Sequence, residues 1–296
     1  MNHENLTFLL ESLKYMGFGD RPELNEQLEH SIGQALPEFN LETEHFFDET
    51  CKLETVLYFR RGNRSDMYFF NRYIARLYYP FDQDRNREQT FYISKGRGVT
   101  FKEAFNLLQG RAVYKRLINL DGEAYFAWVQ LNFDEKDARQ NYKTKQFYPQ
   151  YGYDLEKLLE RYPIRELLLP QLRESLIRSL KRGNRHTVTF TKTNKVEKML
   201  IEACPQFKTI TIYRPAIRSG QAFADNKDPD WEKVPLESDS GDGILWDPEE
   251  ESGMPGILQP ALEEVNEEEE ETSGTEISSP EKAVARKRAT HKKIGL

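Results

Sequence analysis

The stretch FNLETEHFFDETCKLETVLYF, residues 39–59, decides the fold, because large uncharged side chains recur at every second position on both sides of residues 48–50. A period of two is typical of a β-strand that buries one face. The Asp, Glu and Thr between the two runs favour a turn, so the stretch predicts a β-hairpin. Two further segments rich in aromatic and β-branched residues, 67–79 and 90–93, extend the hairpin to an antiparallel meander of about four strands.

The residues before this stretch follow a helical period instead. Asn5 is a plausible N-cap, and leucines follow it at spacings of three and four until two glycines end the pattern. Pro22, which suits a first helical turn, begins a second apolar run that stops at Gly33 or Pro37. We therefore predict a helical hairpin, which together with the meander makes up residues 1–98.

Beyond residue 98 a helix is followed by another meander. Thr100 and Glu103 have the spacing of a capping box, which predicts a helix over residues 100–109. Three strands are expected to follow, at residues 112–118, 125–133 and 142–148. We assign residues 99–150 to this first helix-meander unit.

The same order of elements recurs over residues 151–224. Helices are expected around Leu155, from Ile164, and from Gln171 to Lys181, and strands near residues 187–191, 198–203 and 209–213. Short sequence matches, such as LLQGR at 107–111 with LKRGN at 180–184, make the two units a candidate internal repeat. Two unrelated units would give the same order of elements. The predicted fold class is α+β: a helical hairpin, an antiparallel β-meander and two helix-then-meander units.

The net charge of −7 conceals an uneven distribution along the chain. Residues 1–224 hold 34 basic and 29 acidic side chains, whereas residues 225–296 hold 8 basic and 20 acidic ones. All but two of the 36 aromatic residues lie in the first part, so the material for a core lies there as well. We expect residues 225–296 to be a disordered acidic tail with a basic C-terminus, because this composition cannot bury enough apolar surface to offset the loss of chain entropy.

Targeting, redox and metal signatures are missing from the sequence. The start of the chain, residues 1–13, carries Glu4 and Glu11 and resembles neither a signal peptide nor a membrane span. Cys51 and Cys204 lack the CxxC spacing of a metal or redox site, and we expect both to be buried free thiols. We therefore expect a cytoplasmic protein with no membrane association, no metal and no cofactor.

No pattern of established catalytic chemistry occurs either. The sequence contains no nucleophile elbow, no P-loop and no paired zinc ligands, and its five histidines are scattered. The segment KGRGVTF, residues 95–101, echoes a phosphate loop and an RNA-recognition signature, but it lacks the Gly-Lys-Ser or Gly-Lys-Thr ending of the first and the strand aromatics of the second. It is more typical of a strand-to-helix turn. We expect the chain not to be an enzyme.

Arginines and lysines interleave with aromatic residues through the predicted meander. Cations neutralise phosphates, and exposed rings stack on unpaired bases for about 1–3 kcal/mol each, so the meander is a candidate nucleic-acid-binding sheet. A half-buried sheet points its arginines outward in any case, which leaves an ordinary solvated face as the alternative. The candidate contact residues are Arg60, Arg61, Arg64, Arg72, Arg76, Lys95 and Arg97.

The acidic tail suggests a form of regulation. A tethered polyanion keeps a high local concentration and competes with phosphate for a basic surface, so the tail is expected to shield the sheet. A tail that only solubilises the protein is the alternative. The apolar island around Trp246 is a candidate contact for a protein partner.

Four sequence blocks resemble a known group of proteins. They are DMYFFNRY at 66–73, QTFYI at 89–93, KEAFNLLQGRAV at 102–113 and CPQFKTI at 204–210. These blocks are similar to uncharacterised proteins encoded on conjugative elements of Bacteroidetes, whose repeated domain of unknown function often accompanies topoisomerase and mobilisation genes. The resemblance covers about residues 5–213. It implies a cytoplasmic accessory of mobile DNA and supplies no catalytic residue.

Three hypotheses about function follow. The first is a non-catalytic accessory protein of mobile DNA that contacts DNA or RNA through its basic aromatic sheet. The second is a protein-interaction adaptor without nucleic-acid contact, which presents sheet edges and recruits a partner through Trp246. The third is an enzyme with an unrecognised site. The sequence leaves the oligomeric state open.

Overall fold

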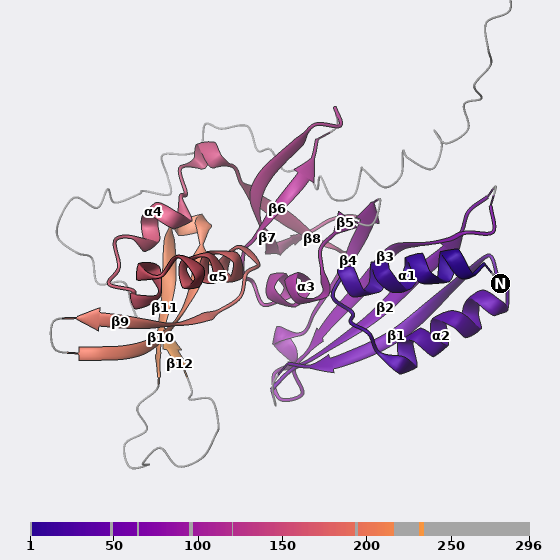
Figure 1. Cartoon of the computed structure of the whole chain (residues 1–296), viewed down its shortest axis with the longest axis horizontal. Helices are drawn as coiled ribbons and strands as arrows, with labels where there is room; N and C mark the ends of the chain where they lie inside the picture. The colour runs from indigo at the N-terminus through magenta and orange to yellow at the C-terminus, as the bar shows by residue number, and fades with distance from the viewer. Residues whose placement is uncertain are drawn as a thin grey trace, which may run out of the picture.

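Three antiparallel sheets and five α-helices make up the described part of the molecule, which has the predicted α+β fold class. In Figure 1 the sheets of five, three and four strands follow one another from right to left along the long axis. The computed structural model describes residues 2–47, 50–63, 65–94, 97–119, 121–192, 195–215 and 231–233.

The five-stranded sheet contains the predicted hairpin and its continuation. Its strands are hydrogen-bonded in chain order: β1 (Glu38–Phe46), β2 (Lys52–Arg61), β3 (Tyr68–Tyr78), β4 (Arg87–Ser94) and β5 (Arg97–Gly98). Leu57 of β2 faces Tyr73 of β3, and both side chains are fully buried. Their neighbours along each strand point to the opposite face, as a period of two requires.

A β-bulge shifts the register between β2 and β3. Tyr58 faces Arg72, whereas the next residue of β2, Phe59, faces Phe70, so β3 carries one extra residue at this point. The bulge therefore turns Phe70 into the core and leaves Phe69 on the opposite face, where it is 44% exposed.

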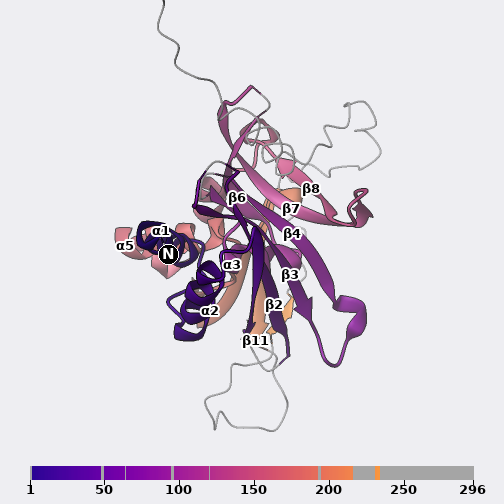
Figure 2. The same cartoon turned by 90° about the vertical axis from the view of Figure 1, so that its right-hand side faces the viewer.

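The predicted helical hairpin covers the buried face of this sheet. Its helices, α1 (His3–Tyr15) and α2 (Pro22–Gly33), lie on one side of the strands (Figure 2). Leu9 and Leu13 of α1 are fully buried, and so is Phe18 in the loop that follows. The helical spacing of the leucines therefore places them on the face of α1 that packs against the sheet.

The prediction of an N-cap at Asn5 is wrong. Asn2 caps α1, and its side-chain oxygen accepts a hydrogen bond from the Asn5 N–H at 3.1 Å. Asn5 is fully buried inside the helix. Its side-chain amide donates to the Tyr68 carbonyl at 3.0 Å and accepts from the Tyr68 N–H at 2.8 Å. The residue satisfies the backbone at the start of β3, which would otherwise be buried without partners.

Helix α3 (Phe101–Leu108) begins at the predicted capping box. The Thr100 N–H donates to Glu103 Oε2 at 2.9 Å, and the Thr100 side chain completes the box. Lys115 Nζ lies 2.8 Å from the same carboxylate oxygen. This contact ties the start of α3 to the next sheet.

The three-stranded sheet contributes one face to each of two cores. Its strands are β6 (Val113–Ile118), β7 (Ala124–Lys136) and β8 (Tyr142–Phe147). Ala127 and Val129 of β7 lie in the core beneath the five-stranded sheet, whereas Trp128 between them packs into a second core. This middle sheet therefore joins the two halves of the described molecule.

The last unit closes the second core. It consists of α4 (Leu155–Leu159), α5 (Pro170–Lys181), β9 (His186–Lys192), β10 (Lys195–Cys204), β11 (Thr209–Pro215) and β12 (Trp231–Lys233), with the sheet order β12-β11-β10-β9. Leu176 and Leu180 of α5 are fully buried against this sheet. None of the helices within the described residues is long and apolar enough to cross a membrane.

Three local predictions need correction. The helix expected from Ile164 is a single 3₁₀ turn, η3 (Arg165–Leu168), because Ile164 bridges to Phe190 and α5 already starts at residue 170. Strand β12 lies within the segment predicted to be tail from residue 225. Neither Cys51 nor Cys204 forms a disulfide within the described residues; Cys51 is buried as predicted, but Cys204 is only partly buried. The remaining 3₁₀ turns are η1 (Gln83–Arg85), η2 (Pro149–Tyr151) and η4 (Pro205–Phe207).

Candidate nucleic-acid surface and cationic cleft

Three of the predicted contact residues lie on one surface. Arg60, Arg72 and Arg76 are exposed on the face of the five-stranded sheet opposite the core that α1 and α2 cover, and we call it the open face. They alternate with buried residues such as Tyr73 and Leu77, so the strand period fixes their direction.

Aromatic rings stand beside these arginines. The Arg72 guanidinium carbon lies 4.8 Å from the centroid of the Tyr58 ring, and Tyr92 of β4 faces Arg72 from the other side. The register also sets Phe69 beside Arg60. The open face therefore combines cations with rings, as the sequence predicts.

Carboxylates are interleaved with the same arginines. Arg76 pairs with Glu88 on β4, and Glu54 faces Arg76 from β2. Arg72, in contrast, makes no ion pair within the described residues. The basic side chains of the open face are Lys52, Arg60, Arg72 and Arg76, and the acidic ones are Glu38, Glu42, Glu44, Glu54 and Glu88. Its charge is therefore close to balanced.

The other predicted contacts do not extend this face. Arg61 follows Arg60 at the end of β2, where it pairs with Asp66 in the following loop. Strand β5 contains the Arg97 backbone. The Arg97 side chain and all of Arg64, Lys95 and Trp246 lie outside the part of the chain that the structure describes.

The glycine-rich segment leads from β5 into α3, as a strand-to-helix turn would. A Cβ atom on Gly98 would lie 2.8 Å from the Tyr92 carbonyl oxygen. Close approach of two backbone segments thus explains this glycine, without any need for a bound phosphate.

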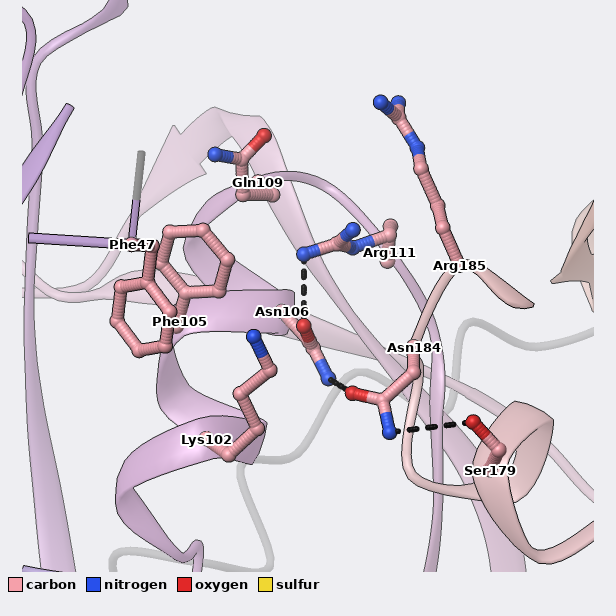
Figure 3. A pocket seen from close by; sticks show the side chains of 9 residues that line it. All are labelled: Phe47, Lys102, Phe105, Asn106, Gln109, Arg111, Ser179, Asn184 and Arg185. Atoms are coloured by element: carbon pink, nitrogen blue, oxygen red, sulfur yellow. Dashed lines mark hydrogen bonds between the residues drawn. The ribbon is translucent and has the colours of Figure 1, made fainter. Parts of the chain in front are cut away.

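A second candidate site, which the sequence did not reveal, lies between α3 and the end of α5. It is a cleft of about 360 Å³, a size within the usual range for small-molecule sites (Figure 3). We call it the cationic cleft. The described residues that line it are Phe47, Lys102, Phe105, Asn106, Gln109, Arg111, Ser179, Asn184 and Arg185, and none of these carries a carboxylate.

Asn106 organises the centre of the cleft. Its side chain is fully buried, and its oxygen accepts from Arg111 Nη2 at 2.6 Å. Its amide nitrogen donates to the Arg182 carbonyl at 2.6 Å and to Asn184 Oδ1 at 2.9 Å. These bonds fix the guanidinium of Arg111 and connect α3 to the turn after α5 (Figure 3).

The electrostatics of the cleft centre on Arg111. Burial and the nearby positive charge of Arg185 lower the pKa of Arg111 to about 10. Burial also acts to lower the pKa of Arg185, but the charge and hydrogen bond of Glu202, 2.9 Å from Arg185 Nε, outweigh it and raise that pKa. Both arginines are therefore protonated at neutral pH, in a place where like charges repel.

A stacked pair of rings forms the opposite wall. The rings of Phe47 and Phe105 have centroids 3.7 Å apart, and Lys102 Nζ lies 4.2 Å and 4.6 Å from them. In Figure 3 the Lys102 side chain extends from α3 toward the centre of the cleft. The cleft thus presents three cations beside an apolar wall.

The cleft is assembled from three separate parts of the chain, Phe47, residues 102–111 and residues 179–185, so no local motif predicts it. One signal existed: the matched blocks at 107–111 and 180–184 are the two turns that meet here. Both turns follow a helix and have glycine at positive φ, Gly110 at 82° and Gly183 at 77°. In each, the residue after the glycine donates its N–H to the carbonyl five residues back. A search for paired helix ends would have located the cleft.

Comparison with models of protein families, with curated proteins and with solved structures gave no match to this chain.

Proposed function

We propose that this protein is a non-catalytic accessory of mobile DNA that contacts DNA or RNA through the open face. The observation that supports this function is the row Tyr58–Arg72–Tyr92, in which a cation without a carboxylate partner among the described residues lies between two rings. Such a row can neutralise a phosphate and stack with bases, the two interactions by which single-stranded nucleic acid binds to a sheet. The resemblance to proteins of conjugative elements supports the same proposal.

Replacing Arg60 and Arg72 with glutamine should weaken binding of a single-stranded oligonucleotide. The slope of log K against log salt is negative, and each lost phosphate contact reduces its magnitude by about 0.7. We therefore expect the magnitude to fall by about 1.4 for two contacts. Fluorescence anisotropy over a salt series measures both the affinity for the oligonucleotide and the slope of its salt dependence. The matched control replaces Arg116 and Arg161, which are exposed elsewhere, and has the same net charge. Equal weakening in both double variants, or no binding by the natural chain at low salt, would refute this contact surface.

Removal of residues 234–296 should tighten oligonucleotide binding. This segment holds 16 acidic and 6 basic residues, and a tethered polyanion competes with phosphate for cations. The cut is placed after Lys233 because β12 pairs with β11. We expect a lower Kd and a steeper salt dependence in the same anisotropy assay, whereas a chain with glutamines at 267–271 should show a smaller effect. An unchanged Kd would mean that the tail does not shield the surface.

A protein-interaction adaptor is the second candidate. The near balance of charge on the open face favours it, because a surface with five carboxylates attracts a polyanion weakly. The salt series separates the two functions. An adaptor shows no oligonucleotide binding at low salt, with or without residues 234–296.

A further inference from the structure

We propose that the cationic cleft binds the phosphate group of a phosphate monoester. This site is separate from the open face, since it lies at α3 and at the turn after α5. The proposal does not depend on nucleic-acid contact by the open face. The phosphate can belong to a small molecule or to the end of a nucleic-acid strand, which share the same chemistry.

Charge is the first argument for an anion. Lys102, Arg111 and Arg185 line one cleft, and the described residues that line it include no carboxylate. Glu202 lies outside this lining, where its carboxylate pairs with Arg185 at 2.9 Å and accepts from the Tyr213 hydroxyl. Arg111 is kept charged in a partly desolvated place beside Arg185. A bound dianion would remove this repulsion, because an opposite charge stabilises a buried cation.

Hydrogen-bonding capacity is the second argument. The buried Nε of Arg111 has no hydrogen-bond partner among the described residues, although its Nη2 is held by Asn106. Buried polar atoms are almost always paired, so this nitrogen is a donor available to a bound acceptor. The guanidinium is thus held in place before a ligand arrives, and its fork matches the geometry of phosphate oxygens.

The nearby backbone does not compete for these cations. Helix C-termini expose carbonyl oxygens, which attract arginines and could explain them without a ligand. Here the Arg182 carbonyl accepts from Asn106 at 2.6 Å and the Gly110 carbonyl accepts from Gln130 at 2.7 Å. Side-chain amides satisfy these carbonyls, so the guanidinium of Arg111 is left for another acceptor.

The dimensions of the cleft restrict the ligand. A volume of about 360 Å³ admits a phosphate with a small organic group but cannot enclose a duplex. The ring pair Phe47–Phe105 supplies an apolar wall for the organic part. A phosphate monoester, which carries up to two charges, matches the cations better than a carboxylate with one charge.

Isothermal titration of the full chain tests the proposal with four probes: inorganic phosphate, adenosine 5′-monophosphate, acetate, and a short oligonucleotide with or without a 5′-phosphate. We expect phosphate-dependent binding that Arg111→Gln weakens roughly ten- to a hundredfold, as loss of a charge-assisted contact does. Lys102→Gln, at an exposed position that tolerates substitution, should weaken it roughly threefold or more. Arg161→Gln is the matched control and should bind like the natural chain.

Each outcome decides the proposal. Binding of the free phosphates assigns a small-molecule source, and binding of the 5′-phosphorylated oligonucleotide alone assigns a strand end. Acetate that binds as tightly as phosphate would overturn the ligand class. No binding of any phosphate probe, or equal binding by the Arg111→Gln, Lys102→Gln and Arg161→Gln variants, would overturn the site. Loss of binding by the cleft variants with unchanged oligonucleotide binding of the open face would separate this site from the proposed function.

Discussion

Replacing Phe18 with alanine should lower the free energy of unfolding by about 3–5 kcal/mol, the usual cost of removing a buried aromatic ring. Phe18 is fully buried, although it belongs to the loop after α1. Its ring centroid lies 5.2 Å from those of Tyr73 and Phe101 and 5.8 Å from that of Phe70. The side chain therefore joins the helical hairpin, the sheet and α3, and the cavity it leaves cannot be filled by one neighbour.

Urea denaturation followed by circular dichroism measures this change. Phe81→Ala is the matched control, because the Phe81 side chain is 92% exposed and its loss should change the free energy of unfolding by less than about 0.5 kcal/mol. Equal stability of the two variants would show that Phe18 does not pack where the structure places it.

Replacing Gly183 with alanine should lower the free energy of unfolding by roughly 2–5 kcal/mol. Its φ of +77° disfavours any residue with a Cβ atom, at a cost of about 1–2 kcal/mol. The added Cβ would also lie 2.8 Å from the Ala112 carbonyl oxygen and 3.1 Å from Asn106 Cβ. Because these atoms form the junction beside the cationic cleft, the clash would also push Asn184 away from Asn106.

Gly122→Ala separates the two contributions. Gly122 has nearly the same φ, +78°, but nothing lies within 4 Å of the position of its Cβ. The same denaturation experiment should therefore show only the backbone cost of about 1–2 kcal/mol. If both variants lost equal stability, the close contact between the turn after α5 and α3 would be disproved.

Local periodicity was enough to predict most elements. The alternation through residues 39–59 predicts β1 and β2, and the Thr100–Glu103 spacing predicts the start of α3. These features succeed because burial of one face imposes a fixed period on each element. The same period places Arg72 and Arg76, four residues apart in one strand, on the same face, whereas the pairing of β2 with β3 brings Arg60 to that face.

Prediction failed where the role of a side chain depends on a contact with a residue far away in the sequence. Asn5 has the residue type of an N-cap, but its amide serves the backbone of Tyr68, 63 positions away. The carboxylates beside the arginines of the open face come from other strands, so counting cations in one stretch overestimates the charge of the surface. Helix packing decides the first case and strand register the second, and neither is contained in a single segment.

The sequence by itself determined most of the helices and strands and the shared outward direction of Arg72 and Arg76, because these depend on spacing within one segment. Only the tertiary structure decided that Arg111, Asn106 and Arg185 meet in one cleft. The turn at Gly110 and the turn at Gly183 come together because two cores share the middle sheet. The cleft forms because the segments around Gly110 and Gly183, about 75 residues apart, pack together. Such a contact produces no periodic pattern in the sequence that could predict it.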